Sequence, residues 1–288
     1  MTTFTPIHTH SHSWASDTGD WRQRAAYNSA FGNCRRRAAI TTEFDADQLH
    51  HWAMQLSQDY LPDRWERVSS SALTRVAVHR ERGLYYKDFV ARSPAAALQA
   101  LATGSRATRA RINGEALLLA GIDAPGTILW GQLPGGTEYL FTVAMPGAGI
   151  DHWLRNLLAK RGPEALRQRR QLLHALGTFI GRVHATGFIH GDLRPDHVLA
   201  ALQQEQFRFT LIDNERNARK TPAPGRMLLR DLMQLNMLAP GVVSRTDRMC
   251  FFRAWRRQMR ELSPIEAKIL AAEAYRRALR RLHHKGQR

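Results

Sequence analysis

Apolar residues recur every three or four positions in several segments of the chain, which is the spacing of helices that bury one face. The clearest segment is 163–186, which begins at a proline and is followed by Gly187. One face of it carries Leu166, Leu173, Leu176, Ile180 and Val183. We expect Arg167, Arg169 and Arg170 to form its solvated face. The same spacing predicts helices over 45–60, 106–120 and 264–282, and an Arg-rich helix that begins near 244.

Short apolar runs replace the helical spacing between 65 and 90. Gly83 separates two of these runs, so we expect a hairpin whose return strand, 84–90, carries Lys87 at its centre. Strands are also expected at 128–130 and 139–143, and the proline and glycine within 144–147 indicate a hinge. A β-rich part followed by a helical part predicts an α+β fold in two lobes.

Residues 189–199, Ile-His-Gly-Asp-Leu-Arg-Pro-Asp-His-Val-Leu, carry the strongest chemical signal. A second apolar run, 209–212, leads to another acid, Asp213. Phosphoryl transfer needs one carboxylate that orients the attacking hydroxyl and another that holds the magnesium bridging the nucleotide phosphates. The spacing His-x-Asp-Leu-x-x-x-x-Asn, followed by a strand that ends in Asp, is the protein-kinase-like signature. Here His197 stands at the Asn position, and Asp213-Asn214-Glu215 replaces Asp-Phe-Gly.

The other parts of a kinase-like site can be assigned from the same pattern. Lys87 lies where a kinase places the lysine that contacts the α- and β-phosphates. Glu115, on the helix at 106–120, is the candidate partner that steadies this lysine. The loop between the first two strands carries Ser69, Ser70 and Ser71 where a glycine-rich loop is expected. We expect these small hydroxyl residues to close over the nucleotide.

Asp231, at the start of an apolar helix, has two interpretations that stay open. It either accepts backbone N–H groups of the 190–197 loop or complements the dipole of its own helix. No Ala-Pro-Glu follows Asp213, so we do not expect a peptide-docking platform of the protein-kinase type.

The charge of the chain is strongly positive, with 42 Lys and Arg against 25 Asp and Glu and a net charge of +17. The segment 245–288 alone holds thirteen basic and four acidic residues. Such an excess attracts polyanions, and composition alone does not choose between nucleic acid, an anionic lipid surface and a phosphorylated glycolipid. Two distant cysteines, Cys34 and Cys250, no long apolar run and no secretory signal pattern lead us to expect a cytoplasmic protein.

These motifs resemble the lipopolysaccharide kinase (Kdo/WaaP) family, over roughly residues 65–282. The resemblance is carried by Gly-Phe-Ile-His-Gly-Asp at 187–192, the histidine at 197, Leu-Ile-Asp at 211–213 and Arg-Asp-Leu at 230–232. It implies a two-lobed protein-kinase-like fold that transfers the γ-phosphate of ATP to a heptose or Kdo sugar of the lipopolysaccharide inner core. It also implies Asp192 as the base, beside His190 in the catalytic loop. Asp213 and His197 would be the Mg²⁺ ligands, and Lys87 with Glu115 the pair that positions the nucleotide. Gly191 departs from the arginine often found at that position.

The resemblance also gives expectations about organisation and partners. Residues 1–60 would be an N-terminal extension, partly disordered and then helical, 61–145 the small lobe, and 146–288 the large lobe with a basic helical tail. We expect that tail to hold the protein peripherally at the inner face of the bacterial inner membrane, near its glycolipid substrate, and expect no nucleic-acid partner. Two alternatives stay open: a phosphotransferase for antibiotics or sugars, which shares the His-Gly-Asp-Leu-x-Pro loop, and a pseudokinase binding module, favoured by the serine-rich loop.

Overall fold

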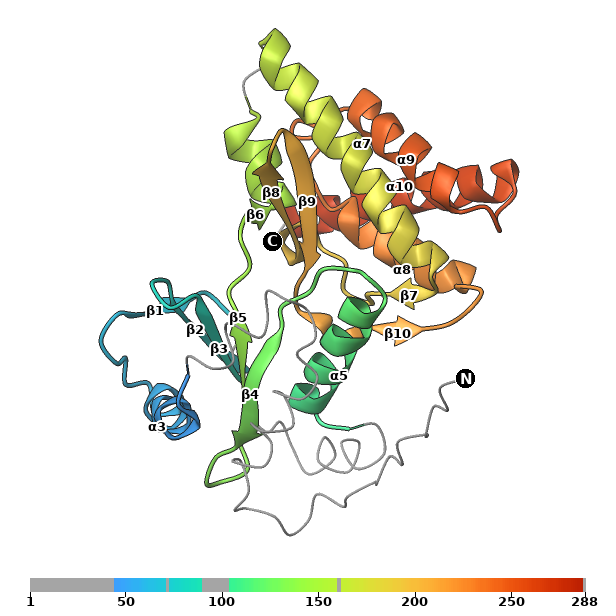
Figure 1. The fold of residues 1–288 in the computed structure, drawn as a ribbon. Coiled ribbons are helices and arrows are strands. Elements are labelled where there is room, and N and C mark those ends of the chain that lie inside the picture. The colour runs from blue at the N-terminus through green and yellow to red at the C-terminus, as the bar shows by residue number, and fades with distance from the viewer. Residues whose placement is uncertain (1–43, 71–72, 90–103, 160–161, 287–288) are drawn as a thin grey trace, which may run out of the picture.

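The computed structural model describes residues 44–70, 73–89, 104–159 and 162–286 of the chain. Its first part is a five-stranded antiparallel sheet in the order β1-β2-β3-β5-β4 (Figure 1). The strands are β1 (Trp65–Val68), β2 (Thr74–His79), β3 (Leu84–Phe89), β4 (Thr127–Gln132) and β5 (Glu138–Val143). The predicted hairpin is confirmed, because β2 and β3 pair with His79 opposite Leu84. Lys87 lies on the central strand, opposite Val76 and Leu140.

Alternation along β3 sends successive side chains to opposite faces of the sheet. Leu84 and Tyr86 are buried on the face covered by helix α3 (Ala46–Ser57), together with Trp65 and Phe141. Phe89 packs on the other face against Ala107 of helix α5 (Arg106–Leu119). Because Lys87 is two residues from Phe89, its side chain also leaves the sheet on the α5 side. The helix predicted over 45–60 is therefore present and packs on this sheet, with Asp45 as its N-cap.

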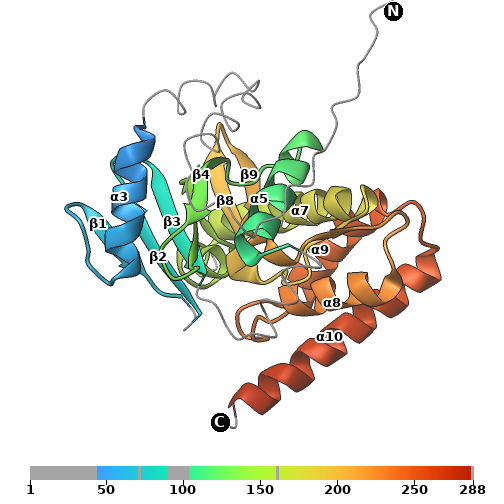
Figure 2. The same ribbon diagram turned by 90° about the horizontal axis from the view of Figure 1, so that it is seen from below.

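The second part of the chain is mainly helical (Figures 1 and 2). Its principal helices are α7 (Pro163–Ala185), α8 (Gly225–Leu235), α9 (Arg245–Gln258) and α10 (Pro264–Gly286), with a short α6 (Ile150–His152) that runs into a π-helix, η1 (Trp153–Leu157). Two small sheets accompany them: β6 (Ala148–Gly149), β8 (Val198–Gln203) and β9 (Gln206–Leu211), and the pair β7 (Phe188–Ile189) and β10 (Ala218–Arg219). Single-turn 3₁₀ helices, η2 (Pro195–His197) and η3 (Asn214–Arg216), follow the two acidic motifs. The architecture is the expected α+β, two-lobed one.

Helices α7 and α9 lie side by side and form the centre of the helical part (Figure 1). Gly177 of α7 faces the backbone of Phe251, and Gly181 faces Gln258 and Trp255. Small residues at a helix–helix contact let the two backbones approach closely. The core around this contact contains Leu173, Leu176 and Ile180, which the apolar pattern of the segment predicts.

The prediction that Arg169 belongs to the solvated face of α7 is wrong. The residue is buried, and its Nη2 lies 3.0 Å from Asp247 Oδ2 of α9. Its Nη1 also donates to the backbone carbonyls of Leu154 and Leu158, each at 3.3 Å. Because η1 and α9 cover this side of α7, a guanidinium with five donors can satisfy several buried acceptors at once. Arg167 and Arg170 are exposed, as expected.

None of the helices in the described part of the chain is both long and apolar enough to cross a membrane.

Candidate active site

Asp231 anchors the loop that carries the His-Gly-Asp motif. Its carboxylate is fully buried and accepts the backbone N–H groups of His190 at 2.8 Å and Gly191 at 2.9 Å. Buried N–H groups need such acceptors, because leaving one unpaired costs free energy. Of the two interpretations of Asp231, the one in which it accepts backbone N–H groups of the 190–197 loop is confirmed. Gly191, at φ 74°, takes a left-handed backbone conformation that favours glycine.

Gln234 is a site residue that the motif search did not find. Its Nε2 donates to Asp192 Oδ1 at 2.7 Å, and its Oε1 accepts the N–H of Leu193 at 3.2 Å. Asp231 and Gln234 are three residues apart, so they share one face of α8. Both are buried beside Leu228, Leu232 and Leu235. Two polar residues on the apolar face of an amphipathic helix are the sequence signal that could have found this pair.

Asp192 is only partly buried, with a quarter of its side chain exposed. Gln234 fixes Oδ1, whereas Oδ2 lies 4.0 Å from Arg194 Nε and 4.0 Å from His197 Nδ1. One carboxylate oxygen is therefore oriented by a neutral amide, and the other faces the cationic edge of the loop. This arrangement leaves Oδ2 as the oxygen that can accept a proton from an incoming hydroxyl.

His190 lies beneath the loop, and both of its ring nitrogens contact backbone groups. Nε2 is 2.9 Å from the carbonyl oxygen of Ile212, and Nδ1 accepts the N–H of Asp192 at 3.3 Å. Because a carbonyl only accepts, the proton is on Nε2 and the imidazole is neutral. Burial lowers the pKa of His190, which agrees with the neutral form. The residue predicted to be catalytic thus connects the loop to the strand before Asp213, without facing solvent.

His197 and Asp213 form the second half of the site. His197 Nδ1 donates to the carbonyl oxygen of Asp192 at 2.8 Å, which leaves the lone pair on Nε2. That nitrogen lies 3.5 Å from Asp213 Oδ2 and accepts hydrogen bonds from the Arg194 guanidinium. One ligand atom each from Asp192, His197 and Asp213 lie within 4.8 Å of one another. Two carboxylates suit Mg²⁺ by atom type and charge, and the imidazole adds a ligand that transition metals bind well.

Lys87 meets two carboxylates. Its Nζ donates to Asp213 Oδ1 and, at 2.6 Å, to Glu215 Oε1. Burial by itself would raise the pKa of Asp213, but the Lys87 ammonium outweighs it and lowers the pKa to about 2. Asp213 is therefore charged at neutral pH, which is the form in which a carboxylate can bind a metal.

The expected pair of Lys87 and Glu115 does not form. Glu115 accepts instead from Arg111 Nη1 at 3.1 Å, one turn earlier on α5. The reason is the rotation of α5: Arg106, Arg109 and Asn113 face the segment after Asp213. Glu115 lies nine residues after Arg106, which is about two and a half turns, so it points the opposite way.

The serine-rich loop is described only in part. Ser69 is exposed, and Ser70 Oγ donates to the carbonyl oxygen of Thr74 at 2.6 Å. Ser71 lies outside the described residues.

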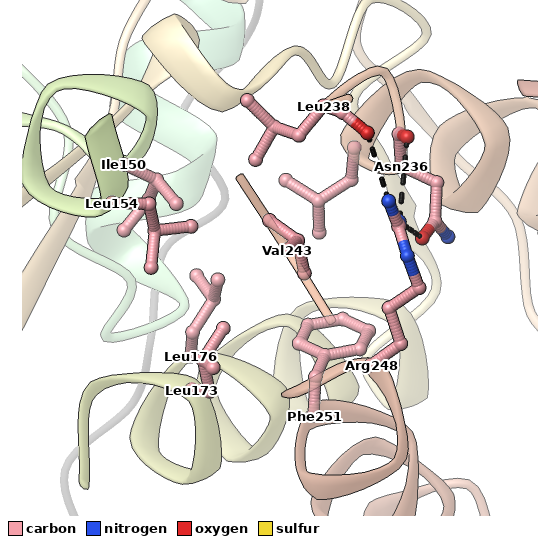
Figure 3. A pocket seen from close by; sticks show the side chains of 10 residues that line it. Ile150, Leu154, Leu173, Leu176, Asn236, Leu238, Val243, Arg248 and Phe251 are labelled. Carbon is pink, nitrogen blue, oxygen red and sulfur yellow. Dashed lines mark hydrogen bonds between the residues drawn. The ribbon is translucent and has the colours of Figure 1, made fainter. Parts of the chain in front are cut away.

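An apolar pocket lies elsewhere in the helical part, between α6, α7 and α9 (Figure 3). Ile150, Leu154, Leu173, Leu176, Leu235, Leu238, Val243 and Phe251 line it, with Asn236 and Arg248 at one edge. Arg248 Nη2 donates to the carbonyl oxygen of Leu238 at 2.8 Å. None of the motif residues belongs to this pocket, so the chemistry points to the site around Asp192.

Comparison with known proteins found a matching family model and solved structures of similar fold. The model of the lipopolysaccharide kinase (Kdo/WaaP) family matches residues 106–255, just over half of the chain. Among solved structures, "WaaP in complex with acyl carrier protein" is similar with a TM-score of 0.51 and 21% identity, covering 75% of this chain and 88% of that chain.

A crystal structure of WbdD is similar with a TM-score of 0.46 and 17% identity, covering 74% of this chain and 45% of that chain. A structure of "the bifunctional kinase-methyltransferase WbdD" is similar with a TM-score of 0.45 and 18% identity, covering 74% of this chain and 46% of that chain. The chain thus spans less than half of the WbdD chains. No curated protein matches the sequence.

Proposed function

We propose that this chain, which belongs to the lipopolysaccharide kinase (Kdo/WaaP) family, transfers the γ-phosphate of ATP to a hydroxyl of a heptose or Kdo sugar in the lipopolysaccharide inner core. The observation that carries the proposal is the convergence of Asp192, His197 and Asp213, with Lys87 bonded to the last of them. We further propose that the nucleotide binds between the small lobe, 61–145, and the large lobe, 146–288.

Asp192 acts on the acceptor hydroxyl. Asp192 Oδ2 takes the proton of the acceptor hydroxyl while the hydroxyl oxygen forms a bond to the γ-phosphorus. The bond from that phosphorus to the β–γ bridging oxygen breaks at the same time, which releases ADP. Gln234 holds the carboxylate in place through Oδ1. Asp231 keeps the loop in shape by accepting two of its N–H groups.

Asp213 and His197 are the proposed ligands of Mg²⁺, which when bound neutralises charge on the β- and γ-phosphates. His197 supplies the Nε2 lone pair, since its other nitrogen donates to a carbonyl. Lys87 contributes a positive charge for the α- and β-phosphates. Its side chain leaves the central strand on the side of these ligands, which supports the assignment.

The basic helices at the C-terminal end support a peripheral contact with an anionic membrane. Arg256, Arg257 and Arg260 are exposed at the end of α9, and Ile265 and Ile269 are exposed on the first turns of α10, at 70% and 62%. Cationic side chains beside exposed apolar ones suit the interface of an anionic bilayer. An inner-core glycolipid is itself anionic and membrane-borne, so the same surface would concentrate the substrate near the inner face of the membrane.

Phosphate transfer from γ-labelled ATP to inner-core glycolipid stripped of its phosphates tests the reaction, with wild type compared with Asp192→Asn. We expect label in the glycolipid with wild type, loss of most turnover with Asp192→Asn, and ATP affinity within about twofold of wild type, because Asp192 acts on the hydroxyl. Full activity of Asp192→Asn would reject Asp192 as the base. Transfer to soluble sugars or aminoglycosides only, or no binding of ATP at all, would favour a small-molecule phosphotransferase or a pseudokinase instead.

Vesicle sedimentation tests the membrane contact. Replacing Arg256, Arg257 and Arg260 by alanine should weaken binding to phosphatidylglycerol vesicles in a salt-dependent way. The matched control replaces Arg64, Arg80 and Arg82, which are exposed on the proposed small lobe, so that the same charge is removed. Equal losses in both triple variants would mean that net charge, and no particular surface, governs binding.

A further inference from the structure

Glu215 is a buried acid that no sequence motif assigns to a role. Its side chain is 9% exposed, whereas that of Glu115 is 34% exposed. Its two carboxylate oxygens have separate cationic partners: Oε1 accepts from Lys87 Nζ at 2.6 Å and Oε2 from Arg106 Nε at 2.8 Å. A carboxylate withdrawn from water is costly unless it is paired and hydrogen-bonded, and here both oxygens are.

Helix α5 holds the segment around Glu215 by its backbone as well. Arg109 Nε donates to the carbonyl oxygen of Glu215 at 3.3 Å, and Asn113 Nδ2 donates to that of Asn214 at 2.7 Å. The three α5 residues that make these contacts, Arg106 included, lie on one face of the helix. The segment from Asp213 to Glu215 is therefore bonded to α5 along two turns of the helix.

Lys87 connects this segment to the sheet. Asp213 and Glu215 are two residues apart, and the left-handed backbone of Asp213, φ 64°, turns the chain so that both carboxylates reach the same ammonium. In the proposed reaction Asp213 turns to the metal and Lys87 to the phosphates. Only Glu215 would then still hold the lysine, since it is the remaining acid within ion-pair distance of Lys87 Nζ among the described residues.

We propose that Glu215 is the positioning residue for Lys87, and that α5 supports it through Arg106 in place of supplying a glutamate of its own. This inference rests on the proposed function, in which Lys87 binds the nucleotide. Glu215, two positions after Asp213, then has the role of positioning Lys87 that the kinase-like spacing predicted for Glu115.

ATP affinity of the purified full chain, measured with a fluorescent ATP analogue and Mg²⁺, tests the proposal. Glu215→Gln should weaken binding and raise KM for ATP by about tenfold, the lower end of what loss of a charged hydrogen bond costs, with a smaller change in kcat. Glu115→Gln, the matched control, should stay within about twofold of wild type. Glu215→Asp keeps the charge and should recover part of the loss.

A double-mutant comparison separates positioning from a general structural effect. In a Lys87→Ala background, Glu215→Gln should change ATP affinity by less than about twofold, because the residue it positions is gone. A tenfold loss in that background as well, or a larger effect of Glu115→Gln than of Glu215→Gln, would overturn the proposal. If Glu215→Gln does not fold, as judged by its melting temperature, the same comparison is made with Glu215→Asp, and equal losses in both backgrounds overturn it.

The outcomes also separate this inference from the proposed function. Wild type that binds ATP but labels no inner-core glycolipid would reject the acceptor and leave Glu215 to be judged on affinity. Wild type that labels the glycolipid, together with a Glu215→Gln variant of unchanged ATP affinity, would reject the inference alone. Wild type without ATP affinity would reject both.

Discussion

Gly177 lies where α7 touches α9, and replacing it by alanine tests how closely the two helices are packed. A Cβ at this position would overlap the carbonyl oxygen of Phe251 and stand 2.9 Å from the Cβ of Ala254. Ordinary contacts between carbon and a carbonyl oxygen are about 3.3–3.6 Å. The obstructing oxygen belongs to the backbone of a helix, so relief requires α9 to move as a whole.

The magnitude follows from two opposing contributions. Alanine in a helix interior is favoured over glycine by about 1 kcal/mol. Overpacking of a core typically costs about 1–3 kcal/mol, and more when a backbone must shift. We therefore expect Gly177→Ala to reduce the free energy of unfolding by about 2 kcal/mol, which lowers the melting temperature by roughly 4–8 °C for a chain of this size.

Gly114→Ala is the matched control. Gly114 is also buried in a helix interior, on α5, but the nearest atom to its new Cβ is the carbonyl oxygen of Pro125 at 3.7 Å. Only the propensity gain remains, so this variant should be more stable by about 0.5–1 kcal/mol. Urea unfolding with an unchanged m-value is the assay. A Gly177→Ala protein as stable as Gly114→Ala would refute close packing of α7 on α9.

Three other predictions concern the site and its support. Gln234→Leu should lower kcat by about tenfold or more, because Asp192 loses its orienting hydrogen bond and the Leu193 N–H in the same loop loses its acceptor. KM for ATP should stay within about twofold, because Gln234 bonds to none of the proposed nucleotide-binding residues. An unchanged kcat in steady-state assays would contradict this. His197→Asn should retain Mg²⁺-supported activity that His197→Ala loses, and should lower the ratio of Mn²⁺- to Mg²⁺-supported rates; a ratio that stays constant argues against His197 as a ligand. Burial alone would raise the pKa of Asp247, but Arg169 and the helix cap together lower it below the unfolded value. The unfolded state therefore binds more protons than the folded state as the pH falls. The contribution of this carboxylate to stability is complete above the unfolded pKa of about 4 and is lost as the pH falls through the lower folded pKa. Unfolding titrations from pH 6 to 3 should show a smaller acid loss for Asp247→Asn than for wild type.

The fold could be predicted largely because its signals are local. Apolar spacing marks α7, and a glycine between two alternating runs marks the β2–β3 hairpin; both signals lie within about twenty residues of sequence. Asp192, His197 and Asp213, which the motif selects, do lie together in the structure, and their roles stay predictions. Asp192 and His197 lie five residues apart in one loop, and Asp213 comes just after β9, so the course of the backbone places all three.

The partners of these residues could not be predicted in the same way. Lys87 and Glu215 are separated by 128 positions, and which of several acids reaches the lysine depends on how α5 is rotated against the large lobe. Helix α5 carries three arginines and one glutamate on different sides, so its periodicity does not say which face turns inward. Arg169 was misassigned for a related reason, because its partner Asp247 belongs to another helix and the sequence does not show that the two meet.

The contacts of α5 also bear on how the lobes could move. Although α5 precedes β4 and β5 in the chain, Arg106, Arg109 and Asn113 bond it to the segment after Asp213 in the large lobe. The sheet meets that same segment through the ammonium of Lys87. A rigid contact along a helix face resists separation more than one ammonium between two carboxylates does, because each additional buried hydrogen bond must be broken together with the others. The sheet is also joined to α5 itself, because Phe89, Trp130 and Leu140 pack on Ala107. Opening of the proposed nucleotide site with α5 held on the large lobe must therefore break this apolar contact as well as the ion pairs of Lys87.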